Sequence, residues 1–130
     1  MKIKTTYLIS LILIFSNILN AQSNNKEPQH IIEVEFEKCL NNEGNMTTIG
    51  MVKCAYEAKQ KWDKELNKYY SLCMEEFSQN EKKALQKSQR SWIKFRDNEL
   101  AFSTLFYANM QGSMYRIPNA IHSKRLTQER

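Results

Sequence analysis

A long stretch without helix-breaking residues is the feature that most constrains this fold. No glycine or proline occurs between Gly50 and Gly112, so the two residues that most disfavour a helix interior are missing from nearly half of the chain. Within this stretch, apolar side chains recur at spacings of three and four residues, which predicts a long amphipathic helix. The stripe consists of Met51, Ala55, Ala58, Trp62, Leu66, Tyr69 and Cys73. No segment alternates apolar and polar residues over a useful length, so we predict an all-α fold.

Capping residues indicate where the long helices begin. Thr47 is a suitable N-cap for a helix that runs to about residue 77. Ser78 and Glu81 form the sequence pattern of a capping box, so a second helix should start there and run to about residue 108. The two helices are therefore expected to form an antiparallel hairpin.

Two shorter helices are expected on either side of this pair. The first covers about residues 30–40 and follows a polar tail at 22–29. The last follows Tyr115 or Pro118, because proline fits a helix only near its first turn. We therefore predict a single all-α domain over residues 30–130, built on a long antiparallel helix hairpin with a short N-terminal and a short C-terminal helix.

The N-terminus has the layout of a secretory signal peptide, residues 1–21. Lys2 and Lys4 precede an apolar run over residues 7–19, and Ala21 offers a small residue for cleavage. The run is too short to cross a bilayer. The first cysteine, Cys39, does not directly follow it, so no lipid anchor is indicated. We expect a periplasmic or secreted protein without a membrane anchor after cleavage.

The remaining composition argues against nucleic-acid binding. After cleavage the chain carries 17 basic and 14 acidic residues, a net charge of +3. Lysine and glutamate are interspersed, and an exported protein rarely meets nucleic acid. We therefore expect a protein partner.

Catalytic and metal-binding patterns are missing from the sequence. The two histidines, His30 and His122, lie at opposite ends of the domain. Neither a Ser-His-Asp order, an HExxH motif nor a phosphate-binding glycine loop occurs. The cysteines and histidines do not have zinc-ligand spacing. The sequence predicts no enzyme activity, no cofactor and no metal.

The segment Gln89–Asp97, QRSWIKFRD, is expected to lie along the hairpin seam. At about 100° per residue, Trp92 and Phe95 should point into the seam, with Gln89 and Arg96 on its shoulder. Across the seam we expect three pairs at equal height: Asp63 with Arg96, Asn67 with Trp92, and Tyr70 with Gln89. Partly buried polar groups need such partners. Arg90 and Asp97 fall on the outer, solvated side.

Several motifs together resemble the LprI-type lysozyme-inhibitor N-terminal domain family. The resemblance covers about residues 35–130 and implies a small exported helical domain. Its namesake inhibits lysozyme. The resemblance rests on the cysteine pair, on WDKELN at Trp62–Asn67 and on QRSWIKFRD at Gln89–Asp97. The residues that we assign to this structural motif are Thr47, Trp62, Asp63, Leu66, Asn67, Tyr70, Gln89, Arg90, Trp92, Arg96 and Asp97.

The chain departs from the family at two cysteines. Related sequences carry cysteines where this chain has Leu100 and His122. If relatives join these positions covalently, Leu100 and His122 should lie close together and pack, which makes His122 a packing residue rather than a ligand or base. The last helix, lacking this staple, is then expected to be the most loosely held element.

The remaining cysteines have distinct expected roles. Cys39 and Cys54 are expected to form a disulfide in an oxidising compartment, which would tie the first helix to the second. Cys73 lies on the apolar stripe, so we expect a buried thiol. The alternative for Cys73 is an intermolecular bridge.

Two functions remain open at this point. The first is a lysozyme inhibitor that fills the two-carboxylate cleft of a muramidase, with Tyr115 and Arg116 in the 109–116 connection as candidate contacts. The alternative for this connection is an ordinary interhelical loop. The net charge of +3 disfavours encounter with a cationic lysozyme. The second function is a structural or stress-related envelope module that binds a protein partner without inhibiting it, and an exposed apolar patch would favour it.

Overall fold

The fold is all-α, as predicted. The computed structural model describes residues 28–130, so the predicted signal peptide and most of the polar tail lie outside the described residues. Four helices occur there, and no strand is found within residues 28–130. The helices are α2 (Ile31–Leu40), α3 (Thr48–Glu76), α4 (Gln79–Ala108) and α5 (Arg116–Gln128), with short 3-10 turns η1 (Glu43–Asn45) and η2 (Ser113–Tyr115).

The predicted capping residues define the start of both long helices. The Thr47 hydroxyl accepts a hydrogen bond from the Gly50 N–H at 3.0 Å. At the next turn, the Glu81 carboxylate accepts hydrogen bonds from the Ser78 hydroxyl at 2.6 Å and from its backbone N–H at 2.8 Å. These two bonds, the hydroxyl bond first, lower the pKa of Glu81 below its ordinary value. The chain therefore reverses at Phe77–Ser78, where the sequence predicted the turn.

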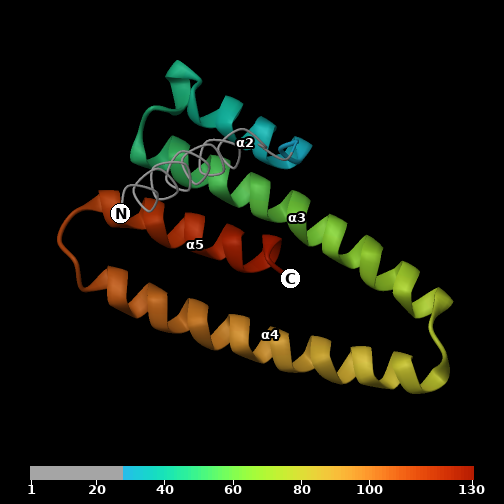
Figure 1. The fold of residues 1–130 in the computed structure, drawn as a ribbon. Coiled ribbons are helices and arrows are strands. Elements are labelled where there is room, and N and C mark those ends of the chain that lie inside the picture. Colours follow the sequence, from blue (N-terminus) through green and yellow to red (C-terminus); the bar gives the residue numbers. More distant parts are fainter. Residues whose placement is uncertain (1–27) are drawn as a thin grey trace, which may run out of the picture.

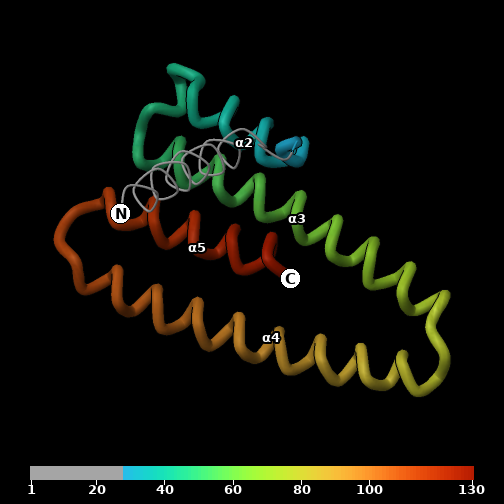
Figure 2. Tube along the Cα trace, in the orientation of Figure 1, coloured from blue at the N-terminus to red at the C-terminus, as the bar shows by residue number. Residues whose placement is uncertain are grey.

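The arms of the hairpin do not pack along a common seam. Helix α5 turns back after the α4–α5 connection and lies between α3 and α4 (Figures 1 and 2). It packs mainly on α3 and to a lesser extent on α4, while α2 covers another side of α3. The hairpin prediction is confirmed, but α5 occupies the space in which direct contact between α3 and α4 was expected.

The predicted Asp63–Arg96 ion pair is consequently wrong. Asp63 accepts a hydrogen bond from Lys59, one turn earlier on α3, at 2.8 Å. The Arg96 guanidinium bonds to the neighbouring Asp97 at 2.7 Å. Phe95 does not point into a seam either, because 54% of its surface is exposed. Asp63 and Arg96 each pair with a residue of their own helix, because α5 separates the two arms.

The core lies where α2, α3 and α5 meet. Its buried residues are Ile32 and Phe36 of α2, Cys54, Ala55 and Ala58 of α3, and Ala120 of α5. The small side chains on α3 allow both neighbours to approach closely. Gly50 serves the same purpose at the start of α3, where a Cβ atom would come within 2.6 Å of the Asn45 backbone.

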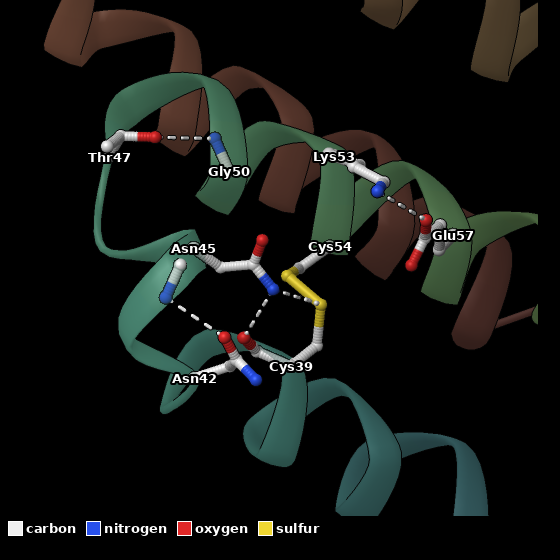
Figure 3. The surroundings of a disulfide bond; sticks show 9 residues. Cys39, Asn42, Asn45, Thr47, Gly50, Lys53, Cys54 and Glu57 are labelled. Atoms are coloured by element: carbon white, nitrogen blue, oxygen red, sulfur yellow. Dashed lines mark hydrogen bonds and ion pairs between the residues drawn. A yellow bond between two sulfur atoms is a disulfide. The ribbon is translucent and has the colours of Figure 1, made fainter.

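A disulfide joins Cys39 of α2 to Cys54 of α3, as predicted (Figure 3). The Cα atoms are 5.8 Å apart, and Cys54 is completely enclosed. The Asn45 side-chain amide donates to the Cys39 carbonyl oxygen at 3.0 Å, which fixes the η1 turn against the bond. The short first helix is thereby tied to the start of α3.

Two further expectations are wrong. Helix α5 is not the most loosely held element, because it buries Ala120, Ser123, Lys124 and Thr127, whereas α4 buries only Ser103. Position between the arms, rather than a covalent staple, holds α5. Cys73 is a free thiol that is half-buried rather than buried, because α5 ends before it can cover that part of α3.

Candidate functional site

The α4–α5 connection lies at one end of the helix bundle (Figure 1). It spans Asn109–Tyr115 and turns at Gly112, whose φ of 105° lies in the left-handed region that favours glycine. Met114 and Arg116 are exposed, whereas Tyr115 is half-buried. Among the hydrogen bonds and ion pairs of residues 28–130, none involves the Arg116 side chain. The connection and the first residue of α5 therefore offer solvent a flexible apolar side chain, Met114, and a cation without an ion-pair partner, Arg116.

Polar contacts attach the start of α5 to α4 directly behind this connection. The Ser103 hydroxyl is 2.8 Å from the Asn119 side-chain oxygen, and the Asn119 amide nitrogen donates to the Thr104 hydroxyl at 3.4 Å. Asn119, Thr104 and Tyr115 also line an open cavity of about 580 Å³ beneath the loop. Arg116 lines the same cavity, so the structure brings the two predicted contacts together, with Arg116 exposed and Tyr115 half-buried.

A polar cluster connects the three core helices. The Glu33 carboxylate accepts a hydrogen bond from the Trp62 indole N–H at 2.8 Å and a further one from the Lys124 ammonium. Lys124 also donates to the Gln128 side chain at 3.0 Å and lies over the Phe36 ring, 4.8 Å from its centroid. Its side chain is only 4% exposed. Trp62 of the WDKELN motif therefore has a structural role, which links α3 to α2 and α5.

Sequence reasoning missed this cluster because its partners are far apart. Lys124 and Glu33 are separated by 91 residues. A glutamate in a charged helix and a lysine in the last helix carry no local pattern that sets them apart from surface charges. The only signal was the tryptophan, whose indole N–H needs an acceptor when it is partly buried.

The second motif, Gln89–Asp97, holds the C-terminus. The guanidinium groups of Arg96 and Arg130 lie 5.1 and 5.9 Å from the Trp92 ring centroid. Arg130 also donates to the Gln89 side-chain oxygen at 3.2 Å and to the Ser88 hydroxyl at 3.1 Å. Trp92 therefore contacts two cations, and the end of the chain is fastened to α4 next to this motif.

Other motif residues lie where the two arms converge near their turn. Asn67 and Tyr70 of α3 line one open groove with Gln89 and Arg90 of α4. The shared groove supports the expected pairing of Tyr70 with Gln89. Asn67 lines the same groove, and its expected pairing with Trp92 stays a prediction. Leu66 lies with Trp62 in a separate hollow beside the end of α5.

The histidine in α5 lies beside a carboxylate of α4. His122 Nε2 lies 3.5 Å from a Glu99 carboxylate oxygen, and both side chains are about one-third exposed. Ser103 lines the same groove between α4 and α5. Its hydroxyl is engaged by the Leu100 carbonyl oxygen and Asn119, so no Ser–His hydrogen bond activates it as a nucleophile. His122 therefore lies near Glu99, the residue that precedes Leu100. A contact between His122 and Leu100 themselves stays a prediction.

The described residues contain neither a metal-ligand cluster nor a membrane span. Within residues 28–130, no three His, Cys, Asp or Glu side chains gather where they could hold a metal ion. In the same part of the chain, every helix is too short or too polar to cross a bilayer. The surface of residues 28–130 presents an exposed loop and several exposed aromatic side chains.

Comparison with known sequences identifies the family. The segment 39–130 matches the family described as Lysozyme inhibitor LprI. The chain belongs to this family. The match begins at Cys39 and so includes α3, α4, α5 and the α4–α5 connection, but only the end of α2. Family membership and the Cys39–Cys54 disulfide are typical of a protein in the periplasm or outside the cell.

The fold is also found among solved structures. A crystal structure of an uncharacterized protein from Burkholderia thailandensis superposes with a TM-score of 0.73 at 26% sequence identity. The alignment covers 79% of this chain and 51% of that one, so the matched part is about half of the Burkholderia protein. No curated protein matches the sequence.

Proposed function

We propose that this protein is an exported inhibitor of a lysozyme and has no catalytic activity of its own. The family match over residues 39–130 carries the proposal, because it includes the whole α4–α5 connection and the helices that support it. The disulfide supports export, since such bonds form in oxidising compartments.

The α4–α5 connection is the part that we propose enters the lysozyme cleft. A muramidase cleft contains two carboxyl groups. Arg116 has no carboxylate partner among the described residues, and Met114 is exposed beside it. The Ser103–Asn119–Thr104 contacts hold the base of this loop against α4. A loop held in place before binding loses less conformational entropy when it enters a cleft.

An inhibition assay with one variant and one matched control tests this proposal. The processed protein should slow the loss of turbidity of a peptidoglycan suspension by lysozymes of several classes. Arg116→Ala should weaken inhibition at least about tenfold, because removing one partner of a desolvated charge pair costs about 2–5 kcal/mol. Arg125→Ala is the control, since Arg125 is an exposed arginine on the same helix that faces Glu129.

The charge of the protein adds a second readout. With a net charge of +3 after cleavage, the protein should associate with a cationic lysozyme faster as ionic strength rises, because salt screens the repulsion. If the Arg116→Ala and Arg125→Ala variants inhibit equally well, Arg116 does not contribute to the inhibitory contact. If no class of lysozyme is inhibited, the proposed function is wrong.

A structural or stress-related envelope module that binds a partner without inhibitory activity is the second candidate. The exposed aromatic side chains on α4 favour it, because a monomeric protein seldom displays a large apolar patch. The same assay separates the two, since such a module leaves the rate of lysis unchanged.

A further inference from the structure

One edge of α4 presents phenylalanine rings that the fold leaves in solvent. Phe95, Phe102 and Phe106 are exposed by 54%, 64% and 48%. Phe102 and Phe106 stack with their ring centroids 6.2 Å apart and line the groove that α4 forms with α5. At about 100° per residue, all three lie about 60–100° around the helix from Ser103, the residue that α4 buries. Helix α5 therefore borders this row of rings without covering it.

The same edge carries small side chains toward the start of α4. Seven positions, spaced four, three, four, four, three and four residues apart, form what we call the Phe95 face: Ala84, Ser88, Ser91, Phe95, Glu99, Phe102 and Phe106. The spacing is the same in both directions from Phe95. The three side chains before it are small and exposed, whereas two of the three after it are phenylalanines. Lys83, Lys87 and Lys94 lie about 80–120° around the helix from Phe95 and so outside this face.

We propose that the Phe95 face binds the same face of a second copy of the chain, with the two α4 helices antiparallel about a twofold axis at Phe95. An isologous interface needs such self-complementarity, because each residue must meet a different residue of the copy or, on the axis, itself. The symmetric spacing provides it. The opposing positions are Phe95 with Phe95, Ala84 with Phe106, Ser88 with Phe102, and Ser91 with Glu99. Each phenylalanine away from the axis thus meets a small side chain, which is how facing layers interdigitate.

The polar side chains of the Phe95 face keep partners in this arrangement. The Ser88 hydroxyl already accepts a hydrogen bond from Arg130 of its own chain at 3.1 Å. The Glu99 carboxylate faces His122 through one oxygen, at 3.5 Å. Its other oxygen can accept a hydrogen bond from the Ser91 hydroxyl of the copy. Buried polar groups need such partners, and Glu99 is the only charged residue among the seven.

The apolar area suits a weak dimer. From their exposed fractions, the three rings leave about 330 Å² in water per copy, or about 660 Å² in two copies. A specific interface buries roughly 1,000 Å² or more, so the rings supply more than half and the small and flanking residues the remainder. We expect a dimer that forms at micromolar concentrations and dissociates on dilution. A helix of another protein could cover the rings, but the small residues at matching positions would then have no role.

Sedimentation velocity of the processed protein, from micromolar to millimolar concentrations, tests for the dimer. Processing is checked by mass spectrometry, because the apolar run at 7–19 would itself promote association. Phe102→Ser should raise the dissociation constant about tenfold or more, since each dimer loses two buried rings. Ile93→Ser is the matched control. Ile93 is an exposed apolar residue of the same helix that lines the groove shared with α3, so its loss should leave the dimer unchanged.

Exchanging large and small side chains tests the register of the two helices. Ala84→Phe alone sets two phenylalanines against each other at both ends and should weaken the dimer about tenfold or more. Adding Phe106→Ala to the same chain restores one small and one large side chain at each end and should recover most of the affinity. This recovery is specific to the antiparallel arrangement about Phe95.

Cross-linking locates the twofold axis. In a Cys73→Ser background, which removes the free thiol, Phe95→Cys should form a disulfide between copies. Ala84→Cys should not, because the two copies of position 84 lie about 33 Å apart at 1.5 Å per residue. Circular dichroism confirms that each variant is folded. Three outcomes would overturn the proposal: a monomer at millimolar concentration, equal effects of Phe102→Ser and Ile93→Ser, or covalent dimers that form as readily through position 84 as through position 95.

Discussion

The buried ion pair between Glu33 and Lys124 gives the sharpest test of how the core is held. Glu33→Gln is the informative change, because glutamine keeps the shape and still offers an oxygen to the Trp62 indole. The charge is lost, however, and Lys124, which is 4% exposed, is left with Gln128 and the Phe36 ring. Removing one partner of a buried pair costs about 3–5 kcal/mol. Glu33 itself is 17% exposed, so we expect the lower end, about 3 kcal/mol.

A double-mutant cycle separates the pair from its surroundings. Lys124→Met alone should cost less, about 1–2 kcal/mol, since Glu33 keeps the Trp62 bond and some access to water. The double variant should come within about 1–2 kcal/mol of the parent, because apolar replacement of a buried pair is often nearly neutral. The coupling energy should therefore reach about 2–3 kcal/mol.

Urea unfolding followed by circular dichroism measures these differences, with equal m-values as the sign that the denatured state is unchanged. The Glu35–Lys61 pair provides the control. It also joins α2 to α3, at 2.7 Å, but both side chains are 48% exposed. Its cycle should give only about 0.2–1 kcal/mol. If both cycles give the same small coupling, burial does not strengthen the Glu33–Lys124 pair and the reasoning fails.

Four further outcomes are expected. Reducing the disulfide between α2 and α3, which spans 15 residues, should lower the free energy of unfolding by about 3 kcal/mol in urea titrations with and without reductant. Amide hydrogen exchange should be faster in α4 than in α5, because α5 is the better buried helix; the reverse order would contradict the packing described above. Ser78→Ala should raise the pKa of Glu81 toward its ordinary value, as followed by carboxyl NMR titration. Since the pKa of Glu81 is lowered in the folded state, the capping box stabilises fully above the ordinary pKa of glutamate and weakens as the pH falls through the lowered value. The variant with Leu100→Cys and His122→Cys should form a disulfide in air, which requires Cα atoms within about 7 Å, and two free thiols by mass spectrometry would refute their proximity.

Local signals in the sequence were sufficient to predict the helices. Thr47 and Ser78 cap α3 and α4, and the spacing of apolar residues predicted both the length and the type of these elements. The disulfide could also be predicted, because an exported chain with two neighbouring cysteines has few alternatives. All of these features depend on residues close together in the chain, for which hydrogen bonding and periodicity give direct rules.

The packing of those helices could not be predicted in the same way. The apolar stripe of α3 was assigned to α4, the next helix in sequence, but Ala55 and Ala58 pack with α2 and α5. A stripe shows that a helix has a buried face without showing which partner covers it. The predicted pair Asp63–Arg96 relied on that assignment and is wrong for the same reason.

The extent to which α5 is buried could not be predicted, because its buried face is polar in composition. Ser123, Lys124 and Thr127 are buried, yet none leaves an unsatisfied polar side-chain atom in the described structure. The Thr127 hydroxyl donates to the Ser123 carbonyl oxygen one turn earlier, at 3.3 Å. Hydropathy counts such residues as surface residues. The Lys124 ammonium is satisfied by Glu33 and by Gln128 one turn later on its own helix, which makes its burial possible.

The position of α5 also determines which surfaces are available for binding. Because α2, α3 and α5 share the core, α4 is held mainly by the capped turn at Ser78, the Ser103–Asn119 contact and the Arg130 contacts beside Trp92. The α4–α5 connection, which we propose binds a lysozyme, begins at the end of this helix. Elements that bind partners are commonly drawn from the less stable part of a fold. In this protein the disulfide and the Glu33–Lys124 pair stabilise a part that this connection does not use, so substitutions in the connection can alter binding without unfolding the core.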